Sequence, residues 1–275
     1  MYNLTVSNTK PATSLEAALR LERLIGLTRG LEQAWREALL ERAAHGKLPT
    51  RPVTVMTGKL GELAFRQATA GLKLRQSGLD AAAVKEIGSR LTKGSKYTYQ
   101  WYIAEDAAIN AFAIPGGYVV VNTGLIQAAD SAEEVAGVLA HEVQHVELRH
   151  TLKNLVHSLG LRAALALALG DISGGALGDV AATLSELKFS RDLESEADQR
   201  GLAALRQASI APQGMVTFFS KLHKQEKGAA PPALLSTHPA SDNRMRTLQD
   251  MIGQQGNWPA QPLPYDWTAI KATAR

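Results

Sequence analysis

The feature that most constrains this chain is the pattern His-Glu-x-x-His at residues 141–145, within the stretch SAEEVAGVLAHEVQHVELRH that runs from Ser131 to His150. In an α-helix, residues four positions apart are rotated by about 40° and lie about 6 Å apart along the axis. His141 and His145 therefore point the same way and can bind one metal ion. Glu142 can reach a water molecule beside that metal and take its proton. This arrangement is typical of a metal-dependent hydrolase.

The residues around the pattern predict one long helix. Ser131 and Glu134 form a capping box ahead of an apolar run, which places the start of the helix near Ser131. Apolar residues then recur at helical spacing, and neither glycine nor proline interrupts the sequence from Val138 to Leu155. The pattern alone leaves open that both histidines are ordinary helix residues, and a third ligand decides between these interpretations.

One rule for a third ligand is excluded by the sequence. The extended pattern HExxHxxGxxH requires Gly at position 148 and His at position 151, where this chain has Leu148 and Thr151. His150 follows His145 by five residues, so on a continuous helix it is rotated about 140° away from the ligand face. We predict that His150 caps the helix or hydrogen-bonds a ligand histidine.

The other rule takes a glutamate from a later helix. The segment SRDLESEAD at residues 190–198 looks helical through Leu205, and it places Glu194 and Asp198 four positions apart on one face. Either acidic side chain can bind the metal while the other orients a ligand histidine or lies over the site.

Four blocks of sequence, in this order, resemble the HtpX/BepA-like zinc metallopeptidases, a gluzincin family related to the CAAX prenyl endoproteases and to a mitochondrial inner-membrane quality-control peptidase. The blocks are NAFAIPGGYVVVNTGLI at 110–126, HExxH with the following Arg149 and His150, the segment 190–198, and Ser236-Thr237-His238-Pro239 with Arg244. The resemblance implies a single Zn2+ held by His141, His145 and Glu194, with Glu142 as the base. It also implies that Asp198 orients the ligands and that Glu196 lies off the metal.

His238 has two roles open to it within this resemblance. It can donate a hydrogen bond to the oxyanion of the tetrahedral intermediate, or it can bind zinc as a fourth ligand and displace the water. Arg244, Asn110 and Tyr118 are predicted to lie on the substrate side. The alternative for Tyr118 is a packing role beside a simple Pro-Gly-Gly hairpin turn.

The sequence predicts an α+β fold that is mostly helical, with a small sheet beside the HExxH helix. Strands are predicted at 53–57, 97–103 and 118–122, and helices near 58–72 and 79–93. An exposed sheet edge at 110–114 suits the binding of an extended peptide. We divide the chain into a tail with accessory helices at 1–50, a peptidase domain at 51–250 and an extended C-terminal segment at 251–275 that packs on the core.

The composition excludes several classes of partner and site. The 30 basic and 26 acidic residues are interspersed and leave a net charge of +4, which gives no footprint for nucleic acid. The chain has no cysteine, which excludes disulfides and thiolate ligands. Its most membrane-like apolar run, residues 163–170, is too short to cross a bilayer, and the N-terminus lacks the features of a signal peptide. Envelope or membrane association, which the family often shows, is expected to come from a segment outside this chain. Neither the compartment nor the oligomeric state has a signature in the sequence.

The expected function is therefore a zinc-dependent endopeptidase that acts on unfolded or misassembled proteins in quality control. CAAX processing is disfavoured, because it needs a membrane-embedded chamber. Two alternatives belong to other classes. One is a chaperone or assembly factor whose zinc site is latched by His238, and the other is a binding module with a closed zinc site. The intact Glu142 argues against the second, since a structural site needs no base.

Overall fold

A computed structural model describes residues 61–274, apart from residues 63, 152, 155–187, 227–231, 240, 255, 257 and 259. The predicted tail at 1–50, the strand at 53–57 and most of the segment between the two metal-binding stretches lie outside the described residues. The elements in chain order are β1 (Leu74–Arg75), α3 (Leu79–Leu91), β2 (Gln100–Ala104), β3 (Ala111–Ile114), β4 (Tyr118–Asn122), α4 (Thr123–Ala128), α5 (Ala132–Glu147), α8 (Arg191–Gln207), α9 (Gln213–Glu226), α10 (Ala233–Thr237), α11 (Asp242–Gln254) and α12 (Trp267–Thr273).

The described strands form one mixed sheet in the order β1-β2-β4-β3. β2 and β4 are parallel, whereas β1 and β3 pair antiparallel with β2 and β4 respectively. β4 has the predicted bounds, and β2 begins three residues after the predicted start. The turn between β3 and β4 needs glycine, because Gly116 and Gly117 have φ angles of 97° and 96° that other residues rarely adopt. The structure confirms the α+β class, and β3 is the edge strand on one side of this sheet.

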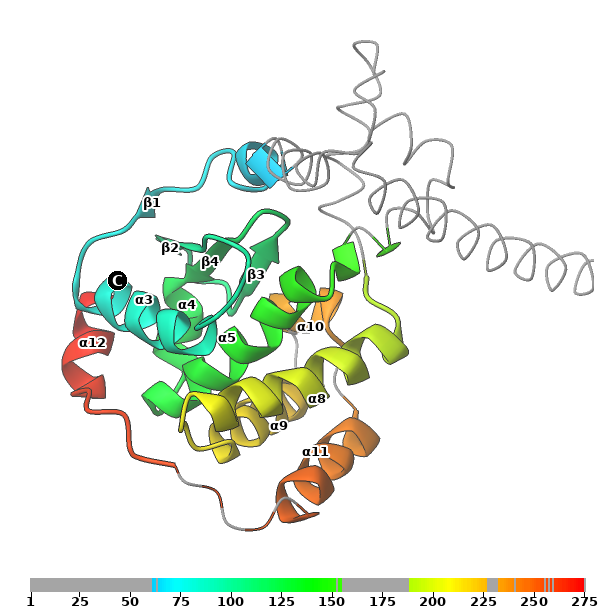
Figure 1. Ribbon diagram of the computed structural model, residues 1–275. Coiled ribbons are helices and arrows are strands. Elements are labelled where there is room, and N and C mark those ends of the chain that lie inside the picture. The colour runs from blue at the N-terminus through cyan, green and yellow to red at the C-terminus, as the bar shows by residue number, and fades with distance from the viewer. Residues whose placement is uncertain are drawn as a thin grey trace, which may run out of the picture. The chain divides into compact units, whose positions relative to one another are not determined.

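Helix α5, which carries the HExxH pattern, lies at the centre of the described fold. It packs against α8, α9, α3 and β3, and so lies between the sheet and the helices below it (Figure 1). The Ser131 hydroxyl caps the helix by accepting the N–H of Glu134, as the sequence predicts. The apolar residues of the predicted stripe are all buried, and His141, Glu142 and His145 are buried with them. A helix buried on all sides holds its side chains rigidly, which is what a metal site requires.

The predicted continuous helix is wrong beyond Glu147, where α5 ends. Leu148 caps it, and Arg149 adopts a left-handed conformation with φ of 56° before residues 150 and 151 become helical again. A left-handed conformation costs about 1–2 kcal/mol in residues other than glycine. Because position 149 is an arginine and not a glycine, the local sequence does not indicate this break. Its consequence is that His150 does not occupy the position that a straight helix gives it.

The C-terminal segment also differs from the extended chain that the sequence predicts. α11 continues to Gln254, and Trp267–Thr273 forms α12, whose N-terminus is capped by Asp266 accepting the N–H of Ala269. The Trp267 indole donates to the carbonyl oxygen of Ala129 at 2.8 Å. This contact ties α12 to the residue that follows α4.

The close approach of α5 and α9 gives a testable consequence for stability. A Cβ atom at Gly137 would lie 2.4 Å from the Cα of Met215 in α9. We expect Gly137→Ala to lower the free energy of unfolding by about 1–3 kcal/mol, because the helices must separate. Gly253→Ala in α11 is the matched control: its Cβ meets no atom within 4 Å, and it should stabilise by up to about 1 kcal/mol. Urea unfolding measures the free energy of unfolding of both variants. Equal changes in the two variants would contradict the close packing of α5 on α9.

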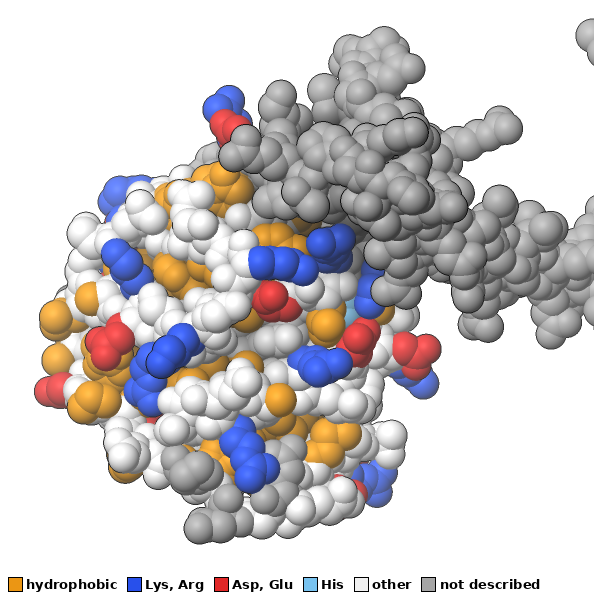
Figure 2. Space-filling view, viewed as in Figure 1, with side chains coloured by type: hydrophobic (Ala, Val, Ile, Leu, Met, Phe, Trp, Pro, Cys, Tyr) orange, Lys and Arg blue, Asp and Glu red, His pale blue; other side chains and the backbone are white. Residues whose placement is uncertain are grey.

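The surface carries charges of both signs. On the face shown in Figure 2, basic and acidic side chains of the described residues are interspersed among apolar ones. None of the helices within the described ranges is both long and apolar enough to cross a bilayer.

Candidate metal centre

Two neighbouring turns of α5 bring the histidines of the HExxH pattern together. The Nε2 atoms of His141 and His145 are 3.0 Å apart, and both side chains are at most 1% exposed. Two ring nitrogens facing each other at this distance need a shared proton or a cation between them. The two histidines therefore supply two of the ligands that a bound cation requires.

Helix α8 crosses α5 and supplies the two acidic residues. Glu194 lies against the ligand nitrogens: its Oε1 is 3.4 Å from His145 Nε2, and its Oε2 is 3.4 Å from His141 Nε2. Asp198 lies behind His141, where its Oδ1 is 2.9 Å from Nδ1. The structure thus separates the two residues that the sequence places on one helix face. Glu194 can bind a metal, and Asp198 can orient a histidine.

His238 directly follows α10 and lies buried against this group. Its Nδ1 is 2.9 Å from Glu194 Oε1 and 3.2 Å from His141 Nε2. The ring of Phe189 stacks on it at 5.2 Å between centroids and also packs on His145 at 4.0 Å. Phe189 was not predicted from the sequence, because its contacts with both histidines depend on how distant segments of the chain pack.

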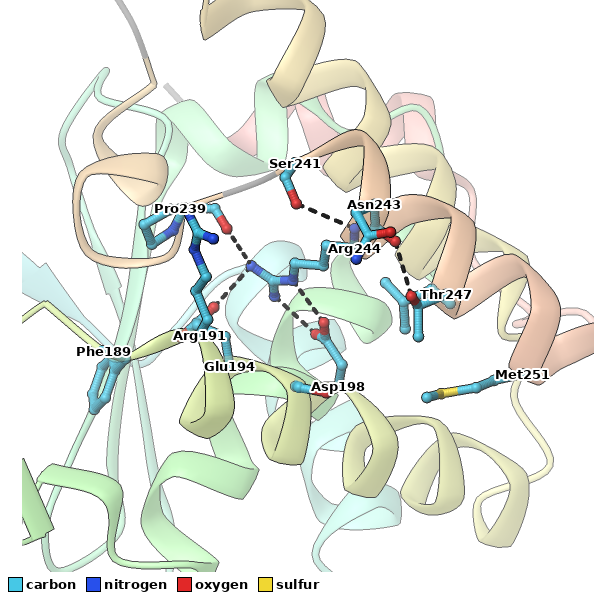
Figure 3. A pocket seen from close by; sticks show the side chains of 12 residues that line it. Phe189, Arg191, Glu194, Asp198, Pro239, Ser241, Asn243, Arg244, Thr247 and Met251 are labelled. Carbon is cyan, nitrogen blue, oxygen red and sulfur yellow. Dashed lines mark hydrogen bonds and ion pairs between the residues drawn. The ribbon is translucent and has the colours of Figure 1, made fainter.

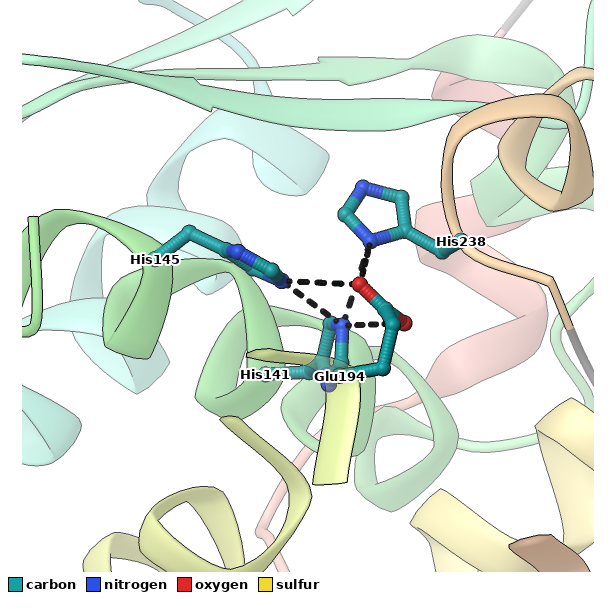
Figure 4. Close-up of side chains that lie close together, drawn as sticks. All are labelled: His141, His145, Glu194 and His238. Atoms are coloured by element: carbon teal, nitrogen blue, oxygen red, sulfur yellow. Dashed lines mark hydrogen bonds and ion pairs between the residues drawn. The ribbon is translucent and has the colours of Figure 1, made fainter. Parts of the chain in front are cut away.

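Four side chains can therefore share one ion, and their geometry fits a metal. His141, His145, Glu194 and His238 each offer a ligand atom, all within 4.8 Å of one another (Figure 4). Four of the separations are 2.9–3.4 Å. A tetrahedron with bonds of about 2.0–2.1 Å has edges of about 3.3 Å, so nitrogen and oxygen ligands at these positions suit an ion such as zinc.

The electrostatics of the group also favour a cation. Burial alone would lower the pKa of His141, but Glu194 and Asp198 outweigh it and raise this pKa to about 9. Burial likewise opposes ionisation of Glu194, yet His141 and its other hydrogen-bond donors hold the pKa of this carboxyl far below its usual range. Without metal, His141 therefore carries a proton that a divalent ion must displace on binding.

Glu142 lies beside the metal group without joining it. Its Oε2 accepts the backbone N–H of Ala113 in β3 at 3.2 Å. Its Oε1 has no hydrogen-bond partner among the described residues, and His238 Nε2 lies 3.3 Å from it. Burial raises the pKa of the Glu142 carboxyl, which strengthens it as a base. The contact from Ala113 was not foreseen, because it depends on how β3 packs on α5.

Arg244 of α11 binds two acidic residues of α8, Glu194 and Asp198. Its Nε and Nη2 donate to Asp198 at 2.6 and 2.8 Å, and its Nη1 is 2.8 Å from Glu194 Oε2. The guanidinium forms part of the wall of an open cavity of about 210 Å³ between α8 and α11, together with Phe189, Arg191 and Met251 (Figure 3). Asp198 thus joins the arginine to His141.

Asn110 directly precedes β3 and Tyr118 is the first residue of β4, and neither belongs to the metal group. The Asn110 carbonyl oxygen accepts the N–H of Asn122 at 3.0 Å, and the Tyr118 ring stacks on Phe65 at 4.7 Å. The predicted substrate role of Asn110, Tyr118 and Arg244 stays a prediction.

Comparisons with known proteins identify the family of this chain. Residues 73–252 match the family described as Peptidase family M48. The beta-barrel assembly-enhancing protease of Yersinia pestis is 29% identical over 212 residues, which cover 71% of this chain and 43% of that protein. Metalloprotease LoiP of Escherichia coli (strain K12) is 34% identical over 192 residues, with coverage of 64% and 75%. Metalloprotease YcaL of the same strain is 33% identical over 178 residues, with coverage of 62% and 68%.

The chain spans less than half the length of the assembly-enhancing protease that it matches. The match extends from the start of the described sheet to α11, and so it includes every member of the histidine and glutamate cluster. The predicted resemblance to HtpX/BepA-like metallopeptidases is confirmed, and the chain belongs to peptidase family M48.

Proposed function

We propose that this chain is a zinc-dependent endopeptidase that cleaves unfolded or misassembled proteins. The observation that carries the proposal is a buried cluster of His141, His145 and Glu194 with Glu142 beside it, in a chain of family M48. Two neutral histidines and one carboxylate are the ligand set of a zinc site that keeps one position open for catalysis. The choice of zinc over other divalent ions rests on this donor set.

The residues divide the chemistry among themselves. His141, His145 and Glu194 would hold the zinc ion, and the bound ion would supply the charge that polarises a scissile carbonyl and lowers the pKa of a water molecule beside it. Glu142 would take the proton from that water through Oε1 and later give it to the leaving amine. Asp198 accepts the Nδ1–H of His141, which keeps Nε2 free to bind the metal.

The edge strand β3 is a docking site for the substrate backbone. Phe112 pairs with Val120 of β4, and the Asn110 carbonyl also faces β4. Because backbone groups alternate sides along a strand, the N–H and C=O groups of Ala111 and Ala113 face away from β4, toward the edge of β3 that pairs with no strand among the described residues. The Ala113 N–H points at Glu142. A peptide added to this edge would therefore pass the base in an extended conformation.

The substrate class follows the relatives. One relative is named a beta-barrel assembly-enhancing protease, and this name links that protein to the assembly of β-barrels. We infer protein substrates of this kind for the chain, with membrane or envelope association supplied from outside the described residues. An edge strand that reads mainly backbone suits substrates that share an unfolded state rather than a sequence.

A second candidate function is an assembly factor whose zinc site is latched and rarely cleaves. The position of His238 favours it, because Nδ1 lies 2.9 Å from Glu194 Oε1 and completes a four-ligand set. A tetrahedral site with four protein ligands leaves no position for water. In this candidate the His238 turn must withdraw before Glu142 can act.

His238→Ala tests the latch. If His238 fills the fourth position, its removal should raise the rate of casein cleavage and weaken zinc binding, both measured on the same preparation. An oxyanion role for His238 predicts the opposite effect on the rate, a loss of about 10²–10³-fold. A lower rate with zinc still bound would therefore contradict the latch.

The proposed function itself is tested with an unfolded protein such as casein. We expect the wild-type chain, or its His238→Ala variant if the latch holds, to cut casein, and we expect 1,10-phenanthroline to stop the reaction. Cleavage that continues in the presence of the chelator would contradict a metal-dependent mechanism. The absence of cleavage by both proteins would contradict the proposed function and the His238 latch alike.

A further inference from the structure

His150 contacts the edge of the His145 ring that carries Nδ1, away from the ligand atom Nε2. The Nδ1 atoms of the two rings are 3.1 Å apart, and His150 is fully buried. On its other side, His150 Nε2 lies 3.2 Å from Oε2 of Glu196, which also accepts from Lys153 at 3.3 Å. These residues form a chain of contacts from a metal ligand to a half-exposed carboxylate on α8.

The break after α5 is what makes this contact. On a straight helix His150 would lie about 140° around the axis and about 7.5 Å along it from His145, and the rings would point apart. Arg149 instead adopts its left-handed conformation, and its Nε donates to the Tyr97 hydroxyl at 3.1 Å. Strained backbone of this kind persists where the surrounding structure holds it, and it is common at functional sites.

The hydrogen-bond roles along the chain of contacts are fixed by the metal group. His145 Nε2 faces the other ligand atoms, so its proton must lie on Nδ1 when the ring binds a cation. That proton is donated to His150 Nδ1, which must be unprotonated. The proton of a neutral His150 then lies on Nε2, where the Glu196 carboxylate accepts it. Each N–H group in this series of contacts, from His145 to Glu196, therefore has an acceptor.

We propose that His150 is a positioning residue for the metal ligand His145, and that Glu196 fixes the tautomer of His150. The two ligand histidines thus have different partners: a carboxylate for His141 and a neutral imidazole for His145. This inference rests on the proposed metallopeptidase function and concerns how the chain holds its ligand in place. His150 touches neither substrate nor metal.

The packing around the two rings supports a positioning role for His150, as opposed to one in which its side chain only fills space in the core. Phe189 covers His145 at 4.0 Å and lies 6.3 Å from His150 between centroids, so an apolar ring borders the contact. A buried polar nitrogen without a partner is costly, and each ring satisfies the other here. Among the described residues, the His145 ring is oriented by side chains, through His150 at Nδ1 and Phe189 on its face.

Zinc affinity measured by competition with a chromogenic chelator tests the proposal. His150→Leu fills the buried site with an apolar side chain and removes the acceptor of the His145 proton. We expect this variant to bind zinc about 10–100-fold more weakly. His150→Asn is the matched variant, because its Oδ1 stands as many bonds from the backbone as Nδ1 of histidine. We expect His150→Asn to restore most of the affinity. Melting temperatures of both metal-free variants separate loss of binding from loss of folding.

Two further measurements sharpen the test. Proton–nitrogen spectra of the histidine rings in the zinc-loaded chain should show His145 protonated at Nδ1 and His150 at Nε2. Arg149→Gly should leave zinc affinity unchanged, because glycine accepts the left-handed conformation of this position without strain.

The outcomes distinguish this proposal from the proposed function. Wild-type affinity in His150→Leu, equal losses in the leucine and asparagine variants, or the opposite tautomers would each overturn the positioning role while leaving the metallopeptidase intact. A wild-type chain that binds no zinc contradicts the proposed function, and the positioning role fails with it.

Discussion

Glu142→Gln is expected to remove peptidase activity while leaving the metal bound. The amide of glutamine has the shape of the carboxylate and can still accept the Ala113 N–H, but it cannot take a proton from water. Loss of a general base costs about 10²–10⁴-fold in rate. The rate of casein cleavage and the zinc content of the same sample measure the two halves of this expectation.

The matched control for this variant is Glu133→Gln on the same helix. Glu133 lies in the first turn of α5, where its Oε1 accepts the Leu263 N–H at 2.8 Å. The same chemical change there should leave the rate unchanged. If Glu142→Gln cleaves casein as fast as wild type, another group is the base and the assignment of Glu142 is wrong.

Removal of Arg244 is expected to give the largest loss of stability among single substitutions at this site. Arg244→Met leaves Glu194 and Asp198 buried, each about 3% exposed, and removes the guanidinium that pairs with both beside the protonated His141. Breaking a buried ion pair from one side costs about 3–5 kcal/mol. The effect should be largest in the metal-free chain, because a bound cation pairs with Glu194 in its place.

Urea unfolding of the metal-free protein measures this effect. Arg244→Lys should lie between wild type and Arg244→Met, since a lysine keeps the charge but cannot form the two-pronged contact with Asp198. Arg191→Met is the control, because Arg191 lines the same cavity but is exposed, and it should change stability by less than about 0.5 kcal/mol. If Arg244→Met lowers the free energy of unfolding no more than Arg191→Met does, the ion pairs of Arg244 contribute little to stability.

The parts of the fold and site that depend on local sequence were predictable. The capping box at Ser131 and the apolar stripe after it indicated α5, and the acidic segment after Ser190 indicated α8. The HExxH spacing indicated two ligands on one helix face, because helical geometry alone sets their direction. The strand at 118–122 followed from its β-branched residues.

The parts that depend on packing between distant segments were not predictable in the same way. Glu194 and Asp198 share a face of α8, and only the crossing of α8 over α5 sends one to the ligand nitrogens and the other to the back of His141. The break at Arg149 has no glycine or proline to indicate it. Its contacts with Tyr97, and those of His150 with His145, offset the strain only in the folded chain.

A zinc add-back titration tests the central claim most directly. The chain is freed of metal with a chelator, zinc is returned in measured amounts, and bound zinc and casein cleavage are followed together in wild type and His238→Ala. We predict one tightly bound zinc per chain, and activity that rises in proportion to bound zinc and stops rising at one equivalent. Activity in the metal-free chain, or zinc that still binds at one equivalent when His141→Ala removes a ligand, would contradict the account.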